Sequence, residues 1–264
     1  MNIIYFPHKL GQLKNGLQNS LKILSSNICK PINVVCCNNS RNNKNNLYKN
    51  LNTLHEVNKK YNRKINIGGD HSMAIGTVSE SLNRYPNLKV LWFDAHPDIN
   101  TYNESKSKNL HGMPLSYLTG LDYDKRFEYI NNKLEFKNLL YIGIRDIDDF
   151  EAKIIKKYDI KFITPGELNK NPEKCLQKIQ QFIKNDPIHI SFDVDCMDPS
   201  LIPSTGTPVK NGLKLRQTTF ILNNLYFNNI VNMDITELNF KIGGQKDKES
   251  SINNFMYLFN NYFE

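Results

Sequence analysis

Apolar and polar positions follow two alternating patterns along this chain. Short runs rich in β-branched residues, typical of buried strands, are separated by longer segments in which apolar residues recur with a helical period. The predicted strands are residues 2–7, 32–37, 64–67, 89–94, 139–144, 160–163, 188–193 and 230–235. The predicted helices are residues 47–61, 73–85, 149–158, 172–184, 215–226 and 248–262. This order predicts a three-layer α/β/α fold, with helices on both faces of a mostly parallel sheet of about eight strands.

Length and composition favour one globular domain over residues 1–264. The 264-residue chain is 39% hydrophobic and 23% charged, which is far from the composition of disordered proteins. Its 34 basic and 26 acidic residues give a net charge of +8, but the lysines are scattered. A nucleic-acid-binding module would instead show a clustered basic face. No leader-like N-terminus or long apolar stretch is present. We therefore expect a cytoplasmic protein without nucleic-acid or membrane partners.

The cysteines indicate a reducing compartment. There are five of them, and none belongs to a Cys-x-x-Cys motif. Cys36 and Cys37 lie in the apolar run 32–37, which we expect to be a buried strand. Cys196 directly follows Asp195, where packing is favoured over a role as a thiol near a metal.

Ligand-type side chains directly follow one predicted strand. Asp94, His96 and Asp98 come after the run 89–93, and the period of two in extended chain sends all three to one side. In parallel sheets, ligands bind beyond the carboxyl ends of the strands. The spacing therefore predicts a binding site at this strand end.

Two further strand ends carry the same residue types. Asp193 and Asp195 would repel each other at this spacing unless a cation lay between them. His71 follows a third strand in Gly-Gly-Asp-His. Alone, an Asp-x-Asp is more often a turn or helix cap, and a single histidine is more often structural. Three such clusters at one sheet edge favour a metal site.

The candidate ligands are His71, Asp94, His96, Asp98, Asp193 and Asp195. Two imidazoles and four carboxylates favour Mn²⁺, and after it Fe²⁺ or Co²⁺, over structural zinc. The set has too many carboxylates for one dication but suits two ions that share bridging carboxylates. With a bridging hydroxide its net charge would be about −1, which matches hydrolysis of a cationic substrate.

Five motifs together resemble the ureohydrolase family. They are Gly-Gly-Asp-His-Ser (68–72), Asp-Ala-His-Pro-Asp (94–98), Asn-Leu-His-Gly-Met-Pro (109–114), Ser-Phe-Asp-Val-Asp (191–195) and Gly-Thr-Pro (206–208). Their order and spacing match that family from about residue 64 to 240. The resemblance implies an arginase-like fold, two Mn²⁺ ions per chain, a small guanidinium substrate and a homo-oligomer, either a trimer or a hexamer.

The resemblance also implies a role for each motif residue. One ion would be bound by His71, Asp94, Asp98 and Asp193, and the other by His96, Asp94, Asp193 and Asp195, so that Asp94 and Asp193 form the bridges. His111 looks like the acid/base and proton-shuttle residue, with an inconsequential loop histidine as the alternative. Asp98 would assist in proton transfer to the departing amine, and Glu237 looks like the carboxylate that pairs with the guanidinium.

Within the family the chain is most similar to arginases, which cleave L-arginine to L-ornithine and urea. Asn100 and Ser107 fall where arginases hold the substrate carboxylate, and Asp148 falls where they hold the α-amino group. Thr207, in the Gly-Thr-Pro motif, is a further expected substrate contact. The alternatives are an enzyme acting on agmatine, guanidinobutyrate or formiminoglutamate, and a catalytically silent member that binds arginine or a protein.

Some positions depart from the family pattern. Lys108 replaces a usual glycine, Phe240 replaces a usual proline, and the run 11–16 is followed by Asn-Ser rather than Gly-Pro. These departures affect substrate specificity and assembly rather than the metal ligands. Three histidines match no motif and are expected to be surface or core residues: His8, His55 and His189.

Overall fold

Strands and helices alternate along the chain as the hydrophobic pattern predicts. The computed structural model describes residues 1–24, 28, 30–43 and 45–263. The strands are β1 (Asn2–Tyr5), β2 (Ile32–Val34), β3 (Lys64–Ile67), β4 (Lys89–Phe93), β5 (Leu139–Ile142), β6 (Lys161–Ile163), β7 (Ile188–Asp193) and β8 (Ile230–Thr236). The helices are α1 (Ser20–Leu24), α2 (Asn45–Asn58), α3 (Ala74–Arg84), α4 (Pro114–Thr119), α5 (Asp149–Lys157), α6 (Pro165–Lys170), α7 (Pro172–Ile183), α8 (Leu215–Asn224) and α9 (Gln245–Phe263).

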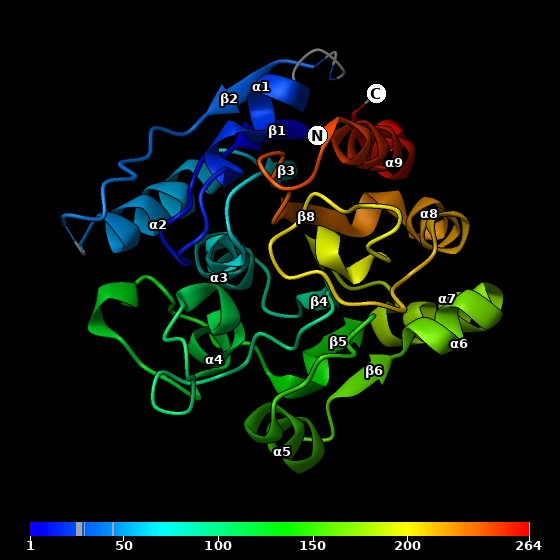
Figure 1. Cartoon of the computed structure of the whole chain (residues 1–264). Helices are drawn as coiled ribbons and strands as arrows, with labels where there is room; N and C mark the ends of the chain where they lie inside the picture. Colours follow the sequence, from blue (N-terminus) through cyan, green and yellow to red (C-terminus); the bar gives the residue numbers. More distant parts are fainter. Residues whose placement is uncertain (25–27, 29, 44, 264) are drawn as a thin grey trace.

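The eight strands form one parallel sheet in the order β2-β1-β3-β8-β7-β4-β5-β6. Helices α2, α3, α4 and α5 pack on one face, and α1, α6, α7, α8 and α9 pack on the other (Figure 1). The predicted three-layer α/β/α architecture is therefore confirmed.

Strand β4 is apolar at every position after its first residue, Lys89, and the packing explains why. Val90 and Trp92 pack among residues of α3, α4 and α5, whereas Leu91 and Phe93 pack among residues of α7 and α9. Because successive side chains of a strand point to opposite faces, a strand covered on both faces needs apolar residues at every position.

One layer of the core is polar. The side chains of Asn58, Asn66, Thr77, Ser81, His189, Asn232 and Asp234, here called the core polar network, are all fully buried. Its members hydrogen-bond one another, as when His189 Nε2 lies 3.0 Å from Asp234 Oδ2 and Asn66 Nδ2 donates to Asp234 Oδ1 over 2.9 Å. His8 and His55 are fully buried too, so all three unassigned histidines are core residues.

The expectation of a buried strand at 32–37 was wrong. Strand β2 ends at Val34, Cys36 is exposed and Cys37 is half-buried. The reason is position, because β2 lies at the edge of the sheet and pairs with β1 alone. A sequence pattern does not distinguish such an edge strand from a central one.

Three short helices were not predicted: α1, α4 and α6 have five, six and six residues. Such helices are too short to show a helical period. Their start signals were nevertheless present for two of them, since Pro114 and Pro165 open α4 and α6 and a Thr164–Glu167 capping box precedes α6.

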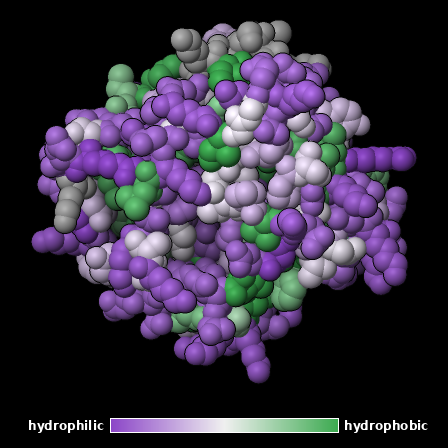
Figure 2. Space-filling view, in the orientation of Figure 1, coloured by the Kyte–Doolittle hydropathy of each residue, from purple (hydrophilic) through white to green (hydrophobic). Residues whose placement is uncertain are grey.

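Hydrophilic side chains cover most of the face seen in Figure 2, with apolar residues scattered among them. Among the helices of the described residues, none has both the length and the apolar character needed to cross a membrane.

Candidate active site and metal centre

Four neighbouring strands, in the order β3-β8-β7-β4, end at one edge of the sheet and carry the candidate site. Their register aligns Ile67 with Ile235, Thr236 with Asp193 and Phe192 with Phe93. The ligand-type residues stand at or just after these positions. We refer to His71, Asp94, His96, Asp98, Asp193 and Asp195 as the strand-end cluster.

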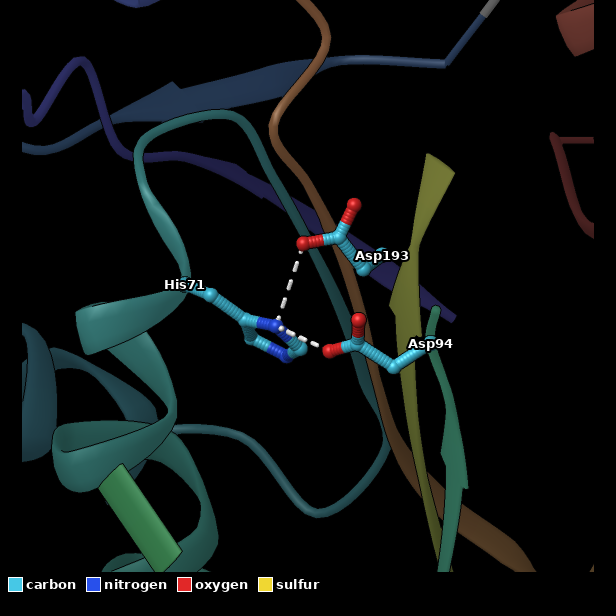
Figure 3. A group of neighbouring side chains, drawn as sticks. All are labelled: His71, Asp94 and Asp193. Atoms are coloured by element: carbon cyan, nitrogen blue, oxygen red, sulfur yellow. Dashed lines mark ion pairs between the residues drawn. The ribbon is translucent and has the colours of Figure 1, made fainter. Parts of the chain in front are cut away.

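His71 lies at the centre of one half of this cluster. Its Nδ1 is 3.0 Å from Asp94 Oδ2, 3.1 Å from Asp98 Oδ2 and 3.2 Å from Asp193 Oδ2. Figure 3 shows the Asp94 and Asp193 carboxylates turned toward this nitrogen. The opposite ring nitrogen, Nε2, lies 2.8 Å from Ser191 Oγ. Ser191 thus holds one side of the ring while the other faces three carboxylates.

Trp92 fixes the same imidazole from its face. Its ring stacks on His71 with centroids 4.2 Å apart and planes 10° apart, and its Nε1 donates to Asp94 Oδ2 over 3.0 Å. The chain's only tryptophan therefore contacts both an imidazole and a carboxylate of the cluster.

His96 joins Asp94 and Asp195 in the other half of the cluster. Its Nδ1 is 3.4 Å from Asp94 Oδ1 and 3.2 Å from Asp195 Oδ2. The backbone amide of His96 donates to Asp94 Oδ1 over 2.8 Å, and that of Ala95 donates to Asp195 Oδ1 over 3.2 Å. Asp94 consequently faces both imidazoles, and each half brings three ligand atoms within 4.8 Å of one another.

The electrostatics of the cluster favour a bound cation. Burial and the neighbouring charges of Asp195 and Asp94 raise the pKa of Asp193 well above its usual range, and burial with Asp94 raises the pKa of Asp98 to about 6. Burial alone would lower the pKa of His71, but its carboxylate neighbours raise it. Crowded carboxylates of this kind bind a cation that offsets their repulsion.

The buried nitrogen His71 Nδ1 also indicates a bound cation. Among the described residues, His71 Nδ1 has no hydrogen-bond partner, although it is fully buried. Buried polar nitrogens normally have a partner, so an unpartnered one points to a missing ligand. With carboxylate oxygens on three sides, the donor set fits a divalent metal, and its oxygen content suits Mn²⁺.

Two site residues have strained backbones. Asp98 has φ 51° and Glu237 has φ 65°. Residues with a side chain rarely adopt this left-handed conformation, which costs roughly 1 to 3 kcal/mol and occurs preferentially at functional sites. Contacts with the surrounding structure therefore offset this backbone strain and hold both carboxylates in place.

A cleft of about 270 Å³ opens directly above the cluster. Its lining includes His96, Asp98, Asn100, Ser107, His111, Asp148, Asp193 and Thr207, so it contains the sequence-predicted substrate contacts except Glu237. Thr207 Oγ1 donates to Asp195 Oδ2 over 2.7 Å. The fully buried His71 and Asp94 lie beneath this lining.

The far wall of the cleft is acidic. Asn100 Nδ2 donates to Asp148 Oδ2 over 3.0 Å, and the buried Glu151 also lines the cleft. Glu151 accepts from the amides of Ile99 and Asp148 over 3.1 and 3.2 Å. Burial raises the pKa of Glu151 to about 8.

Glu237 lies behind His111 rather than on the cleft surface. Its Oε1 is 3.3 Å from His111 Nδ1 and accepts from the His71 amide over 3.0 Å. Burial would lower the pKa of His111, but the hydrogen bond to Glu237 and its charge raise it to about 9. His111 is thus protonated at neutral pH in this geometry.

A larger cavity of about 660 Å³ is lined in part by residues 10–13, Tyr48, Tyr102 and Arg126. None of the described residues that line it is a histidine. Metal or acid/base chemistry therefore belongs to the smaller cleft.

The two single-residue departures from the family pattern, Lys108 and Phe240, occupy different environments. Lys108 is exposed and has φ 57°, a conformation that glycine adopts without strain, which explains why a glycine suits this position. Phe240 is buried in the main core cluster, away from the cleft lining.

Several contributors to the site escaped the sequence analysis: Gln12, Trp92, Glu151 and Ser191. Glu151 had a detectable signal, because Asp148 and Glu151 form a capping box at the start of α5. In the sequence, Trp92 and Ser191 could not be distinguished from ordinary strand residues.

Comparisons with known proteins extend these observations. The profile of the Arginase family matches residues 7–256. The arginase of Coccidioides immitis (strain RS) is 42% identical over 193 residues, which cover 66% of this chain and 58% of that protein. The arginase of Staphylococcus aureus (strain COL) is 36% identical over 207 residues, covering 72% and 68% of the two chains. The match thus spans less than two thirds of the Coccidioides protein.

Solved structures match over nearly the whole chain. The crystal structure of Entamoeba histolytica arginase in complex with L-ornithine has a TM-score of 0.88 and 30% identity, covering 98% of this chain and 97% of its own. The arginase of Bacillus subtilis has a TM-score of 0.83 and 27% identity, with 97% of both chains covered.

Proposed function

Because this chain belongs to the arginase family, we propose that it hydrolyses the guanidinium group of L-arginine to L-ornithine and urea. The observation that carries the proposal is the strand-end cluster, in which a buried imidazole nitrogen faces three carboxylates beneath a cleft. The Entamoeba histolytica arginase structure contains L-ornithine, the product expected from arginine.

The strand-end cluster would hold two Mn²⁺ ions, with Fe²⁺ or Co²⁺ as alternatives. His71, Asp94, Asp98 and Asp193 would bind one ion, and His96, Asp94, Asp193 and Asp195 the other. The position of Asp94 between the two imidazoles supports its bridging role. When bound, such ions supply Lewis-acid activation of water near neutral pH.

The chain's own residues would handle the protons. Asp98, which lines the cleft next to His71, would assist proton transfer to the departing amine. His111, with a pKa of about 9, carries a proton that it can deliver to the departing amine. Glu237, which lies 3.3 Å from His111 Nδ1 and beneath the cleft lining, would pair with the cationic guanidinium.

The far end of the cleft would select an α-amino acid. Asp148 offers negative charge to an α-amino group, while Asn100 and Ser107 offer hydrogen bonds to a carboxylate. Thr207, bonded to Asp195, would help to shape the floor. Agmatine lacks the carboxylate that these groups would recognise.

The rival functions differ in what they predict. Another ureohydrolase, acting on agmatine, guanidinobutyrate or formiminoglutamate, would keep the metal ligands and change the far end of the cleft. A catalytically silent family member would bind arginine or a protein without turnover. The polar lining at Asn100, Ser107 and Asp148 favours arginine over the first group.

The test is urea release from a panel of these substrates by the Mn²⁺-loaded protein. We expect kcat/KM for L-arginine to exceed that for agmatine by at least ~10²-fold, because a site built for polar groups is penalised when the substrate lacks them. Equal turnover of the two would reassign the chain to the agmatine-type enzymes. Arginine binding without urea release would establish the silent alternative.

We further propose that residues 1–264 form one arginase-like domain, that the protein is cytoplasmic, and that it assembles as a homo-trimer or hexamer without nucleic-acid or membrane partners. Light scattering coupled to size-exclusion chromatography measures the assembly directly. A monomer at micromolar concentration would contradict it.

A further inference from the structure

The 11–16 segment crosses the site and ties several of its parts together. Gly11 N donates to Asp70 Oδ2 over 2.8 Å, and Gly11 O accepts from the His111 amide over 3.1 Å. Lys14 Nζ donates to Gly206 O, next to Thr207. The segment thus contacts the loops that carry His111 and Thr207 while supplying no metal-type ligand itself.

Gln12 is the residue of this segment that points at a site carboxylate. Its side chain is buried, and its Nε2 donates to Glu237 Oε2 over 2.5 Å. Within the described part of the chain, no other hydrogen bond to Glu237 Oε2 is formed, because the His71 amide and His111 both approach Oε1. The backbone of Gln12 is fixed as well, since its carbonyl accepts from Arg41 Nη2 over 2.7 Å.

We propose that Gln12 is a positioning residue that orients the Glu237 carboxylate toward the guanidinium, an inference that rests on the proposed function. Without the amide, Oε2 would be a buried acceptor with no donor, and the carboxylate would turn toward the remaining donors on the Oε1 side. The choice of glutamine also has a chemical reason. A neutral amide holds the carboxylate in place without cancelling the negative charge that the guanidinium requires, whereas lysine or arginine would cancel it.

The experiment is a double-mutant cycle between Gln12→Met and Glu237→Gln in the Mn²⁺-loaded enzyme. Methionine keeps the length of the side chain and removes the donor. We expect Gln12→Met to raise KM for L-arginine by roughly 10-fold or more, the range for a lost hydrogen bond to a charged group, with kcat within about threefold of wild type. In the Glu237→Gln background the same substitution should change KM by less than about twofold, because the group it positions is gone.

The split between KM and kcat separates positioning from structural damage. A partly unfolded preparation contains fewer active molecules, which lowers the apparent kcat and leaves KM unchanged. Leu13→Ala is the matched control, because Leu13 belongs to the same segment but is 72% exposed, and it should behave as wild type. Metal content and Tm are measured for every variant. If Gln12→Met does not fold, Gln12→Asn, which is polar but too short to reach Glu237, should raise KM in the same way.

The outcomes distinguish this inference from the proposed function. A KM for Gln12→Met within twofold of wild type, alongside a strongly impaired Glu237→Gln, overturns the role of Gln12 alone. An equal rise in KM in both backgrounds overturns it too, because Gln12 would then act independently of Glu237. If Glu237→Gln with full metal content hydrolyses arginine within threefold of wild type, the guanidinium does not meet Glu237, and both assignments fall.

Discussion

The core polar network and the strand-end cluster are both buried, both built on β7 and β8 or their neighbours, and yet electrostatically opposite. In the network, Asp234 Oδ1 accepts from Asn66, and Oδ2 accepts from Thr77 and lies 3.0 Å from His189 Nε2. In the cluster, His71 Nδ1 lies within 3.2 Å of three carboxylate oxygens but has no hydrogen-bond partner among the described residues.

The difference separates a structural polar core from a binding site. Each polar group of the first region has a counterpart, so the region is complete within the chain. The second region contains four buried carboxylates, the buried His71 and the partly exposed His96, and it becomes complete only when a cation is added. Burial alone therefore does not identify function, whereas a buried nitrogen that lacks a partner and faces three carboxylates does.

Removing metal should give the largest effect. Chelation is expected to lower urea release from arginine by at least ~10³-fold, with Mn²⁺ restoring it best among divalent ions, because the oxygen-rich set suits that ion. Tm should also fall, since a ligand that binds only the folded state stabilises it. Full activity in a preparation that elemental analysis shows to be free of transition metals would contradict the assignment of the cluster.

The same Asp→Asn substitution in the two regions should change stability in opposite directions. In Asp234→Asn, the new amide faces donors on Asn66, Thr77 or His189, so the free energy of unfolding should fall by about 2 to 4 kcal/mol. In metal-free Asp193→Asn, one of the crowded carboxylates becomes neutral, and the amide oxygen can still accept from the Asp195 amide. Because the pKa of Asp193 is raised by burial and by neighbouring charges, losing its charge should leave the metal-free protein as stable or more stable.

Denaturant unfolding of the metal-free proteins measures both changes. Asp193→Asn should at the same time lose metal binding and activity, which calorimetry and urea release report. Similar destabilisation by the two substitutions would show that the strand-end cluster is as complete without metal as the core polar network.

The strand-end cluster was predictable from sequence for a physical reason. Parallel strands end at one edge of a sheet, so polar residues that directly follow apolar runs, such as Asp94 and Asp193, are brought together whatever the details of packing. The strand-end argument does not apply to the cleft residue His111, because no strand directly precedes it. His111 was located only through its motif. The alternation of strands and helices likewise determined the layers.

What the sequence did not reveal depends on distant pairs. Gln12 meets Glu237 across 225 positions, and Ser191 meets His71 across 120. No local pattern encodes such contacts, which arise when the whole sheet and its loops assemble. The prediction that Cys36 lies in a buried strand failed for a related reason. The order of strands in the sheet decides which strand lies at the edge, and the local sequence does not encode that order.

A pair of Ser→Ala substitutions should give the smallest effects and sharpen the comparison most. Ser191 Oγ lies 2.8 Å from His71 Nε2, and Ser81 Oγ lies 3.0 Å from His189 Nδ1, so each serine holds one imidazole. A hydrogen bond to the far nitrogen of a metal-binding histidine orients the ring, and its loss typically lowers metal affinity 10-fold to 100-fold, which is about 1.4 to 2.7 kcal/mol. Ser191→Ala should therefore weaken metal binding while changing the stability of the metal-free protein little. Ser81 Oγ also accepts from Asn232 and donates to Thr77 O, so Ser81→Ala should lower the free energy of unfolding by about 1 to 3 kcal/mol and leave metal affinity unchanged. Metal titration followed by the fluorescence of Trp92, which stacks on His71, measures the first effect, and denaturant unfolding measures the second. If both substitutions weaken metal binding equally, the two regions form one connected unit and their separation into structure and site is wrong.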